Sequence, residues 1–517
     1  MRRFPRFLLV LPPLAGAFLA GCAGHRATTT VAAAAAAAPA DPGTPPAFDA
    51  IAPDEIRRDL FTLASDAMRG REAGTLDELR ASAWLAERAR AAGLEPAGDD
   101  GTYFQFWPMR RTVTSKSSVV QIDGRAVRLG ADAYVVTPIN ATRSGPVTWI
   151  GTGAEAIADG PTLEGKIVAL ELTAPTTMPA RGMSLWAFRY TNAAITERVR
   201  ALAAKRVAAI LVVSDSIAER ELTGFYGQVL THGRYGIDSA GVTPPNPAAS
   251  VPVVWLSRAY LDDLRRTPAP TVSIAVDLDS YLYPSVNVVA RVRGTDPALR
   301  DEYVLFSAHQ DHDGVRAPVR GDSIYNGADD NASTSVALLA IGRAFARHPG
   351  RRSALFVWHG AEERGLLGSR WHAWHPTVPR DRIVAVLNGD MIGNNSPDTA
   401  GLLGVQPPHR NSSDLALMAL DANARVAHFV IDSTWDRPSH PEFWYFRSDH
   451  VPYARHGIPV VYFSTLPHAL YHTPFDEPQT VNVEKLTRMA RWMYATGMAV
   501  ADADARPRVD PGFKLER

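Results

Sequence analysis

Side chains that can bind a metal ion follow three apolar runs in the second half of the chain. The runs at 304–308, 355–358 and 384–387 are followed by His309, by Glu362 with Glu363, and by Asp390. Nearly continuous apolar runs of this length are typical of strands buried on both faces of a sheet. Because ligands bind beyond the carboxyl ends of such strands, we expect these side chains to meet at one sheet edge.

Two loops add further candidate ligands. Asp330 lies in the loop 327–333, before an apolar helical pattern, and His472 lies in the loop 471–474, after the last apolar run. Two imidazoles and three carboxylates without thiolates suit zinc, or a harder divalent ion, in a catalytic site. Five ligands are too many for one tetrahedral ion with an open position. They fit two ions that share a bridging carboxylate.

In this order the motifs resemble those of the co-catalytic zinc aminopeptidase family, some branches of which carry an inserted protease-associated domain. The resemblance extends from the segment 65–72 to His472-Thr473-Pro474. It implies that two zinc ions are bound per chain, one by His309 and Asp390, the other by Glu363 and His472, with Asp330 between them. It also implies that Glu362 is the general base and that Asp311 orients the imidazole of His309.

Other interpretations exist for each residue and for the whole chain. Alone, Asp330 would be a helix cap and His472 a loop histidine; the ordered set of five makes the metal site the stronger interpretation. The family resemblance implies removal of N-terminal residues from peptides. The alternatives on the same fold are a carboxypeptidase and an enzyme resembling glutaminyl cyclases, and a further alternative is a non-catalytic binding protein of the cell envelope.

The elements that must position these residues predict an α/β fold. Apolar strands alternate with helical patterns, such as 332–347, in which Leu338, Ile341 and Phe345 share one face. This alternation predicts a three-layer α/β sandwich with a mostly parallel or mixed central sheet. Short β-rich runs between Gly and Pro loops, with a single helical stretch at about 191–206, predict a smaller inserted α+β domain, the expected protease-associated domain.

The N-terminal residues have the pattern of an export signal. Arg2, Arg3 and Arg6 precede the apolar run 8–20, and small residues precede Cys22, which is the only cysteine. The pattern resembles a bacterial lipoprotein signal, so we expect a lipid anchor at Cys22 as the only membrane contact of an exported cell-envelope protein. The Ala- and Pro-rich residues that follow predict a tether.

These patterns divide the chain into segments. We expect a signal peptide at 1–21, a lipidated N-terminus with its tether at 22–46, peptidase segments at 47–110 and 285–505 around the insert 111–284, and a C-terminal tail at 506–517. Lys and Arg together equal Asp and Glu at 54 each, which provides no overall positive charge to attract nucleic acid. Peptides are the expected partners, and the pattern leaves the oligomeric state open.

Overall fold

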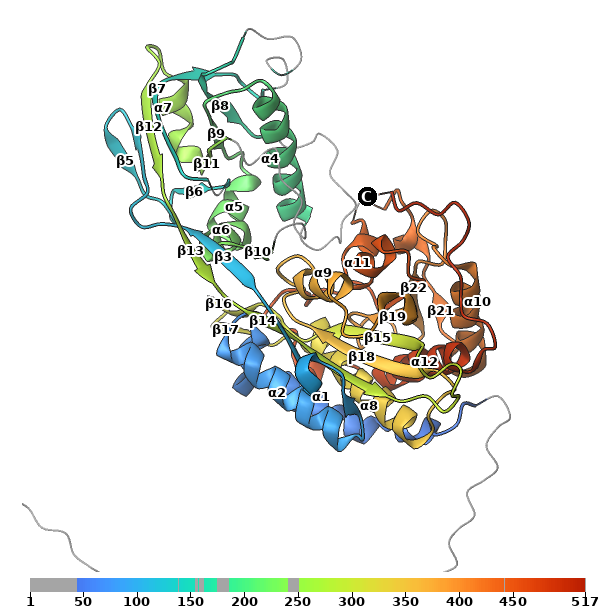
Figure 1. Ribbon diagram of the computed structural model, residues 1–517. Helices are drawn as coiled ribbons and strands as arrows, with labels where there is room; N and C mark the ends of the chain where they lie inside the picture. The colour runs from blue at the N-terminus through green and yellow to red at the C-terminus, as the bar shows by residue number, and fades with distance from the viewer. Residues whose placement is uncertain are drawn as a thin grey trace, which may run out of the picture. The chain divides into compact units, whose positions relative to one another are not determined.

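The computed structural model describes residues 44–137, 139–153, 157, 162–173, 186–239, 251–440 and 442–516 (Figure 1). The expected signal peptide, Cys22 and nearly all of the expected tether lie outside these ranges. From Gly43 onward the chain forms one compact unit. Within the described ranges, no helix combines the length and the apolar character needed to cross a membrane.

A nine-stranded mixed sheet forms the centre of the fold. Its main path runs in the order β1-β14-β18-β15-β19-β22-β20-β21, and β2 pairs with β14. The four strands β18, β15, β19 and β22 are mutually parallel, whereas β14 and β20 pair antiparallel with their neighbours β18 and β22. The strands are β1 (Glu95–Pro96), β2 (Phe104–Trp107), β14 (Ser285–Val292), β15 (Tyr303–His309), β18 (Ser353–His359), β19 (Ile383–Gly389), β20 (Thr399–Leu403), β21 (Val430–Ile431) and β22 (Val460–Ser464).

Both faces of this sheet are buried, which confirms the expected α/β character. Successive residues of one strand belong to different core clusters: Phe306 packs with one set of side chains and Leu305 with another. The first cluster includes side chains from α1 (Pro53–Leu63), α2 (Leu76–Ala91), α8 (Thr334–Arg347), α10 (Ser413–Ala422) and α12 (Val483–Asp502). The second includes side chains from α9 (Leu367–Trp374) and α11 (His450–Arg455).

Helix α8 follows an irregular turn that matters for the site. The apolar pattern predicted a helix over 332–347, and the α-helix begins at Thr334. The preceding turn, Ala328–Ser333, leaves helical geometry at Asp330 and Asn331. Asn331 fastens this turn to the sheet, because its side-chain amide donates to the carbonyl oxygen of Gly389 at 3.0 Å. The turn therefore lies against the carboxyl end of β19.

The residues between β2 and β14 form a second, separate sheet of eight strands in the order β5-β4-β12-β7-β8-β9-β11-β6. Its strands are β4 (Val119–Ile122), β5 (Arg125–Val127), β6 (Ala133–Val135), β7 (Ala141–Trp149), β8 (Ile167–Glu171), β9 (Ala209–Val213), β11 (Val253–Leu256) and β12 (Thr271–Val276). Two apolar clusters of its own cover this sheet, as an independently packed unit requires.

The sequence underestimated the helical content of this insert. Beside α4 (Trp186–Ala204), which overlaps the single predicted stretch, the described residues form α5 (Ala218–Thr223), α6 (Phe225–His232) and α7 (Leu261–Arg265). The three added helices are short, between 5 and 8 residues, so each shows too few turns for a clear apolar period. A three-stranded sheet combines β10 (Arg234–Ile237), β3 (Met109–Thr114) and β13 (Leu278–Leu282), and β16 (Gly314–Val319) pairs with β17 (Asp322–Tyr325).

Arg71 ties the N-terminal helical segment to the loops beyond the central sheet. Its fully buried guanidinium donates to the carbonyl oxygens of Gln310 at 2.7 Å, Asn326 at 2.7 Å, Gly327 at 2.9 Å and Leu63 at 2.9 Å. Burial lowers the pKa of Arg71 to about 10, and nearby carboxylates oppose this shift, so the group keeps its charge at neutral pH. One cation therefore satisfies four carbonyl groups from three separate segments.

Arg71→Met is expected to lower the free energy of unfolding by about 3–5 kcal/mol, because it leaves buried carbonyl groups without a donor. The measurement is urea unfolding followed by circular dichroism. Arg58→Met is the control, since the side chain of Arg58 is 54% exposed in its ion pair with Asp59 and such a pair contributes about 1 kcal/mol at most. Equal losses in the two variants would contradict the role assigned to Arg71.

Candidate metal centre

The structure brings the five predicted ligands together. His309 ends β15, Glu363 and Asp390 follow β18 and β19, and His472 lies in the loop after β22. Since these four strands are parallel neighbours, their carboxyl ends lie at one edge of the sheet. Asp330 reaches the same place from the turn before α8. All five side chains are largely buried, the most exposed being His472 at 12%.

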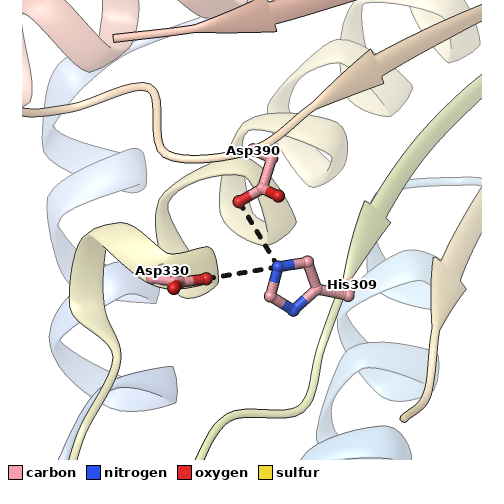
Figure 2. Close-up of side chains that lie close together, drawn as sticks. All are labelled: His309, Asp330 and Asp390. Atoms are coloured by element: carbon pink, nitrogen blue, oxygen red, sulfur yellow. Dashed lines mark hydrogen bonds and ion pairs between the residues drawn. The ribbon is translucent and has the colours of Figure 1, made fainter. Parts of the chain in front are cut away.

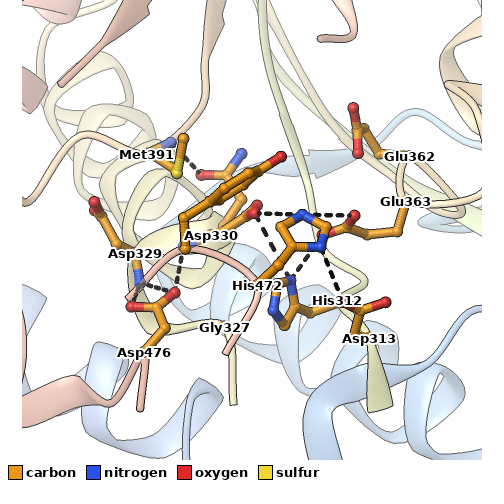
Figure 3. Close-up of polar contacts among 12 residues, drawn as sticks. His312, Asp313, Gly327, Asp329, Asp330, Glu362, Glu363, Met391, His472 and Asp476 are labelled. Carbon is orange, nitrogen blue, oxygen red and sulfur yellow. Dashed lines mark hydrogen bonds and ion pairs between the residues drawn. The ribbon is translucent and has the colours of Figure 1, made fainter. Parts of the chain in front are cut away.

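The ligand atoms form two groups that share one carboxylate. In the first group, His309 Nε2 lies 3.2 Å from Asp330 Oδ1 and 3.3 Å from Asp390 Oδ1 (Figure 2). In the second, His472 Nε2 lies 3.3 Å from Asp330 Oδ2 and 3.3 Å from Glu363 Oε2 (Figure 3). The two oxygens of Asp330 therefore belong to different groups.

The separations within each group fit a bound zinc ion. Two ligands at 2.0–2.2 Å from a tetrahedral ion lie about 3.3–3.5 Å apart, and the four separations in the structure are 3.2 or 3.3 Å. Each group has one imidazole nitrogen and two carboxylate oxygens. Three protein ligands leave a fourth position open, which is the arrangement of catalytic rather than structural zinc sites. The donor set thus suits two divalent cations.

The electrostatics of the site favour positive charge. Burial acts to lower the pKa of His309, but the charges of Asp390 and Glu362 and a hydrogen bond with Asp330 raise it well above its ordinary value. The pKa of His472 is raised well above its ordinary value too, with burial opposing and Glu363 the largest favourable contributor. These carboxylates stabilise a positive charge on the imidazoles, and a divalent cation at either group would satisfy the same field.

Glu362 lies beside the ligands, within the same cluster as His309 and Glu363. Figure 3 draws its carboxylate next to Glu363 and outside the network of marked contacts. Removal from water raises the pKa of Glu362 well above its ordinary value; His309 opposes the rise, and the charges of Glu363 and Asp390 add to it. A carboxylate with a raised pKa beside a metal site can accept a proton at neutral pH.

The carboxylate of Asp311 binds the main chain of the segment that carries Glu362 and Glu363. The sequence had predicted a contact between this carboxylate and the imidazole of His309. Instead, the Asp311 carboxylate accepts the main-chain N–H groups of Glu362 at 3.0 Å and Glu363 at 3.3 Å. Its Oδ1 is 3.9 Å from His309 Nδ1, which lies closer to the main-chain oxygen of Asp311, at 3.1 Å. The side chain is drawn away from the imidazole because two N–H donors converge on it.

Two carboxylates near the site were missed from the sequence. Asp313 Oδ2 lies 3.0 Å from Nδ1 of His472 and so orients that imidazole. Asp476 accepts the main-chain N–H groups of Asp329 and Asp330 at 3.0 Å and fixes the turn that carries the shared carboxylate. In the sequence, Asp313 stands two residues after Asp311, and Asp476 stands four residues after His472. Neither spacing indicates which group the carboxylate contacts.

A cavity of about 540 Å³ opens beside the second group. Glu362, Glu363 and His472 line it, together with the rings of Tyr235, Tyr325, Phe446 and Tyr471. Residues 229 and 232–235, which belong to α6 and β10 or join them, form part of its wall. A cavity that joins candidate metal ligands to aromatic side chains is the natural place for a substrate to bind.

Comparisons with known proteins find similar peptidases. Residues 287–497 match the sequence pattern of peptidase family M28. An aminopeptidase of Pseudomonas aeruginosa strain UCBPP-PA14 is 26% identical over 242 residues, which cover 45% of this chain and 40% of that protein. Leucine aminopeptidase 1 of Aspergillus niger is 28% identical over 172 residues, covering 31% of this chain and 39% of that protein. The match thus spans about two-fifths of the length of these curated relatives.

Solved structures share the fold. An aminopeptidase from Aneurinibacillus sp. strain AM-1 has a TM-score of 0.57 at 18% identity, covering 90% of this chain and 97% of its own. BSAP, a zinc aminopeptidase from Bacillus subtilis, has a TM-score of 0.54 at 17% identity, covering 90% and 99%. The family match at residues 287–497 contains all five candidate ligands and Glu362. Through this segment, the chain is similar to peptidase family M28.

Proposed function

We propose that the chain is a zinc-dependent aminopeptidase that binds two zinc ions and hydrolyses the N-terminal peptide bond of peptides. The observation that carries this proposal is the division of Asp330: its two oxygens complete two separate ligand groups, each with one histidine and one further carboxylate. Relatives named aminopeptidase and zinc metalloprotease support the same chemistry. Bound at these groups, zinc supplies polarisation of the scissile carbonyl and lowers the pKa of the attacking water.

Glu362 is the general base in this proposal. Its raised pKa suits a group that takes a proton from water and then gives it to the leaving amine. Glu363, the next residue, faces His472 Nε2 at 3.3 Å, so the adjacent carboxylates have different tasks. Asp311 fixes the main chain that carries both glutamates, because it accepts the main-chain N–H groups of both residues.

The cavity is where the substrate would bind. Its wall carries both carboxylates, including Glu362 and Glu363, and guanidinium groups, including Arg316, Arg364 and Arg447, so it offers polar contacts to the amino and carbonyl groups of a peptide. Its aromatic rings offer apolar contacts to side chains of the substrate. The names of the relatives favour an aminopeptidase over an enzyme that acts on the carboxyl end of a peptide.

We propose that the eight-stranded sheet and its helices are the protease-associated domain, since they pack around their own apolar clusters. The pattern before Cys22 supports export to the cell envelope with a lipid anchor at that residue. Equal numbers of acidic and basic residues support peptides rather than nucleic acids as partners.

The central prediction concerns substrate and metal together. The protein should hydrolyse one or more aminoacyl chromogenic amides, lose this activity on dialysis against a chelator, and regain it with zinc. Release of the chromophore is the measurement, and N-acetylated amides are the control that should not react. Cleavage that persists without metal would contradict the proposal. Exclusive cleavage of N-blocked peptides from the carboxyl end would indicate a carboxypeptidase.

Glu362→Gln should lower kcat by about 10²–10⁴-fold, because the amide cannot accept the proton of the attacking water. Zinc content, measured by mass spectrometry, should stay at the level of the unchanged protein. Glu477→Gln is the matched control: Glu477 accepts from Asn326 Nδ2 at 3.1 Å, and a glutamine oxygen can replace this contact. Full activity of Glu362→Gln would assign the base to another residue.

The two groups should lose metal separately. Asp390→Asn should weaken binding of the ion at His309, and Glu363→Gln that of the ion at His472, so each variant should retain about one zinc per chain. Asp330→Asn should weaken both, because its oxygens belong to both groups. Zinc is measured after dialysis against a buffer with a weak chelator. Unchanged zinc content in the Asp330 variant would exclude a shared carboxylate.

A further inference from the structure

His312 lies beside the second ligand group but is not one of the five predicted ligands. It follows Asp311 after the end of β15, and its ring is fully buried. Nδ1 of His312 lies 2.7 Å from Oε1 of Glu363 (Figure 3). The ring also packs edge-to-face against His472, with the ring centroids 5.4 Å apart. His312 therefore touches two candidate ligands of the same ion.

The distances separate two possible tasks for this histidine. Two ligands of one tetrahedral zinc lie about 3.3–3.5 Å apart, and the four ligand pairs of the site match this separation. The contact of 2.7 Å between His312 Nδ1 and Glu363 Oε1 is too short for a pair of ligands and has the length of a hydrogen bond with a charged partner. The next oxygen, Asp330 Oδ2, lies 4.0 Å from Nδ1. His312 is thus placed as a donor to Glu363.

Because His312 donates to Glu363, the two carboxylate oxygens of Glu363 have different partners. Oε1 accepts from His312, and Oε2 faces His472 Nε2 at 3.3 Å. With Oε1 occupied, the carboxylate offers one oxygen to an ion, and its rotation is restricted. Groups that hold a ligand in this way typically contribute about 10–100-fold to metal affinity.

The surroundings hold the imidazole in place. A Cβ atom added at Gly327 would lie 2.3 Å from Cγ of His312, so the ring fills the space that this glycine leaves. The main chain of His312 forms a bridge with Glu72. Among the described residues, Nε2 of His312 has no hydrogen-bond partner, so Nδ1 is the ring nitrogen that forms the hydrogen bond.

We propose that His312 is a positioning residue that fixes Glu363 as a one-oxygen ligand and thereby sets the affinity of the second zinc ion. This inference rests on the proposed function, because it requires an ion between Glu363 and His472. It adds a residue that acts on one of the two ions and not on the other: the ligand atoms at His309 and Asp390 make no contact with His312 in the described structure.

Three substitutions separate the hydrogen bond from the bulk of the ring. His312→Phe keeps a ring and removes the donor. His312→Asn places an amide N–H near the position of Nδ1, whereas His312→Gln places it further along the side chain. His409→Phe is the matched control, because His409 is also buried with its Nδ1 2.9 Å from a carboxylate, that of Asp436, outside the ligand groups. Circular dichroism of each metal-free variant confirms folding.

The readout is zinc binding, measured by titration against a chromophoric chelator that resolves the two ions. We expect His312→Phe and His312→Gln to bind one ion as the unchanged protein does and the other about 10–100-fold more weakly. His312→Asn should recover most of this loss, and His409→Phe should bind both ions normally. If the Phe variant does not fold, the comparison of Asn with Gln still decides the question.

Other results of the zinc titration would contradict the role of His312. Normal affinity for both ions in the Phe and Gln variants, or equal weakening of both ions, would overturn the role of His312 and leave the aminopeptidase proposal intact. An Asn variant as weak as the Gln variant would also overturn it, since the hydrogen bond would not be the cause. If the unchanged protein binds fewer than two zinc ions, the proposed function and the role of His312 fail together.

Discussion

The shared carboxylate of Asp330 is the contact on which the site depends. Its two oxygens lie within 3.3 Å of His309 and His472, so a small displacement would disrupt both ligand groups at once. The protein fixes this residue through its main chain: Asp476 accepts the N–H of Asp330, and the side chain of Asn331 binds Gly389. The irregular turn before α8 is therefore held to the sheet through Asn331 and to the loop after β22 through Asp476.

The parallel centre of the sheet explains why the other ligands converge. Strands β18, β15, β19 and β22 end at the same edge of the sheet. The candidate ligand His309 is the last residue of β15, and the other three strands are followed by segments that carry candidate ligands. Buried, apolar strands give these ends a rigid base, which a site with tolerances of about 0.5 Å requires. Arg71 extends this support to the N-terminal segment, because it binds the carbonyl oxygens of Gln310 and Gly327, close in sequence to two of the ligands.

The insert has its own sheet and core, yet it also reaches the cavity. Residues 229 and 232–235 line the space beside Glu362 and His472. His232 contacts Glu72 and Arg316, and Arg316 in turn contacts Asp313, which orients His472. A chain of polar contacts thus connects the insert with a candidate metal ligand.

The sequence by itself predicted the strands that carry the site, the α/β character and five candidate ligands, because burial on both faces of a parallel sheet leaves continuous apolar runs whose ends mark the site. Only the tertiary structure decided which carboxylate serves which partner. Asp311, expected at His309, binds the N–H groups of Glu362 and Glu363, while Asp313 contacts His472 and His312 contacts Glu363. These pairs are 51 to 159 residues apart, and two neighbouring aspartates look alike in the sequence. Their tasks depend on which loop from another strand reaches each side chain, and the packing of the whole sheet sets that distance.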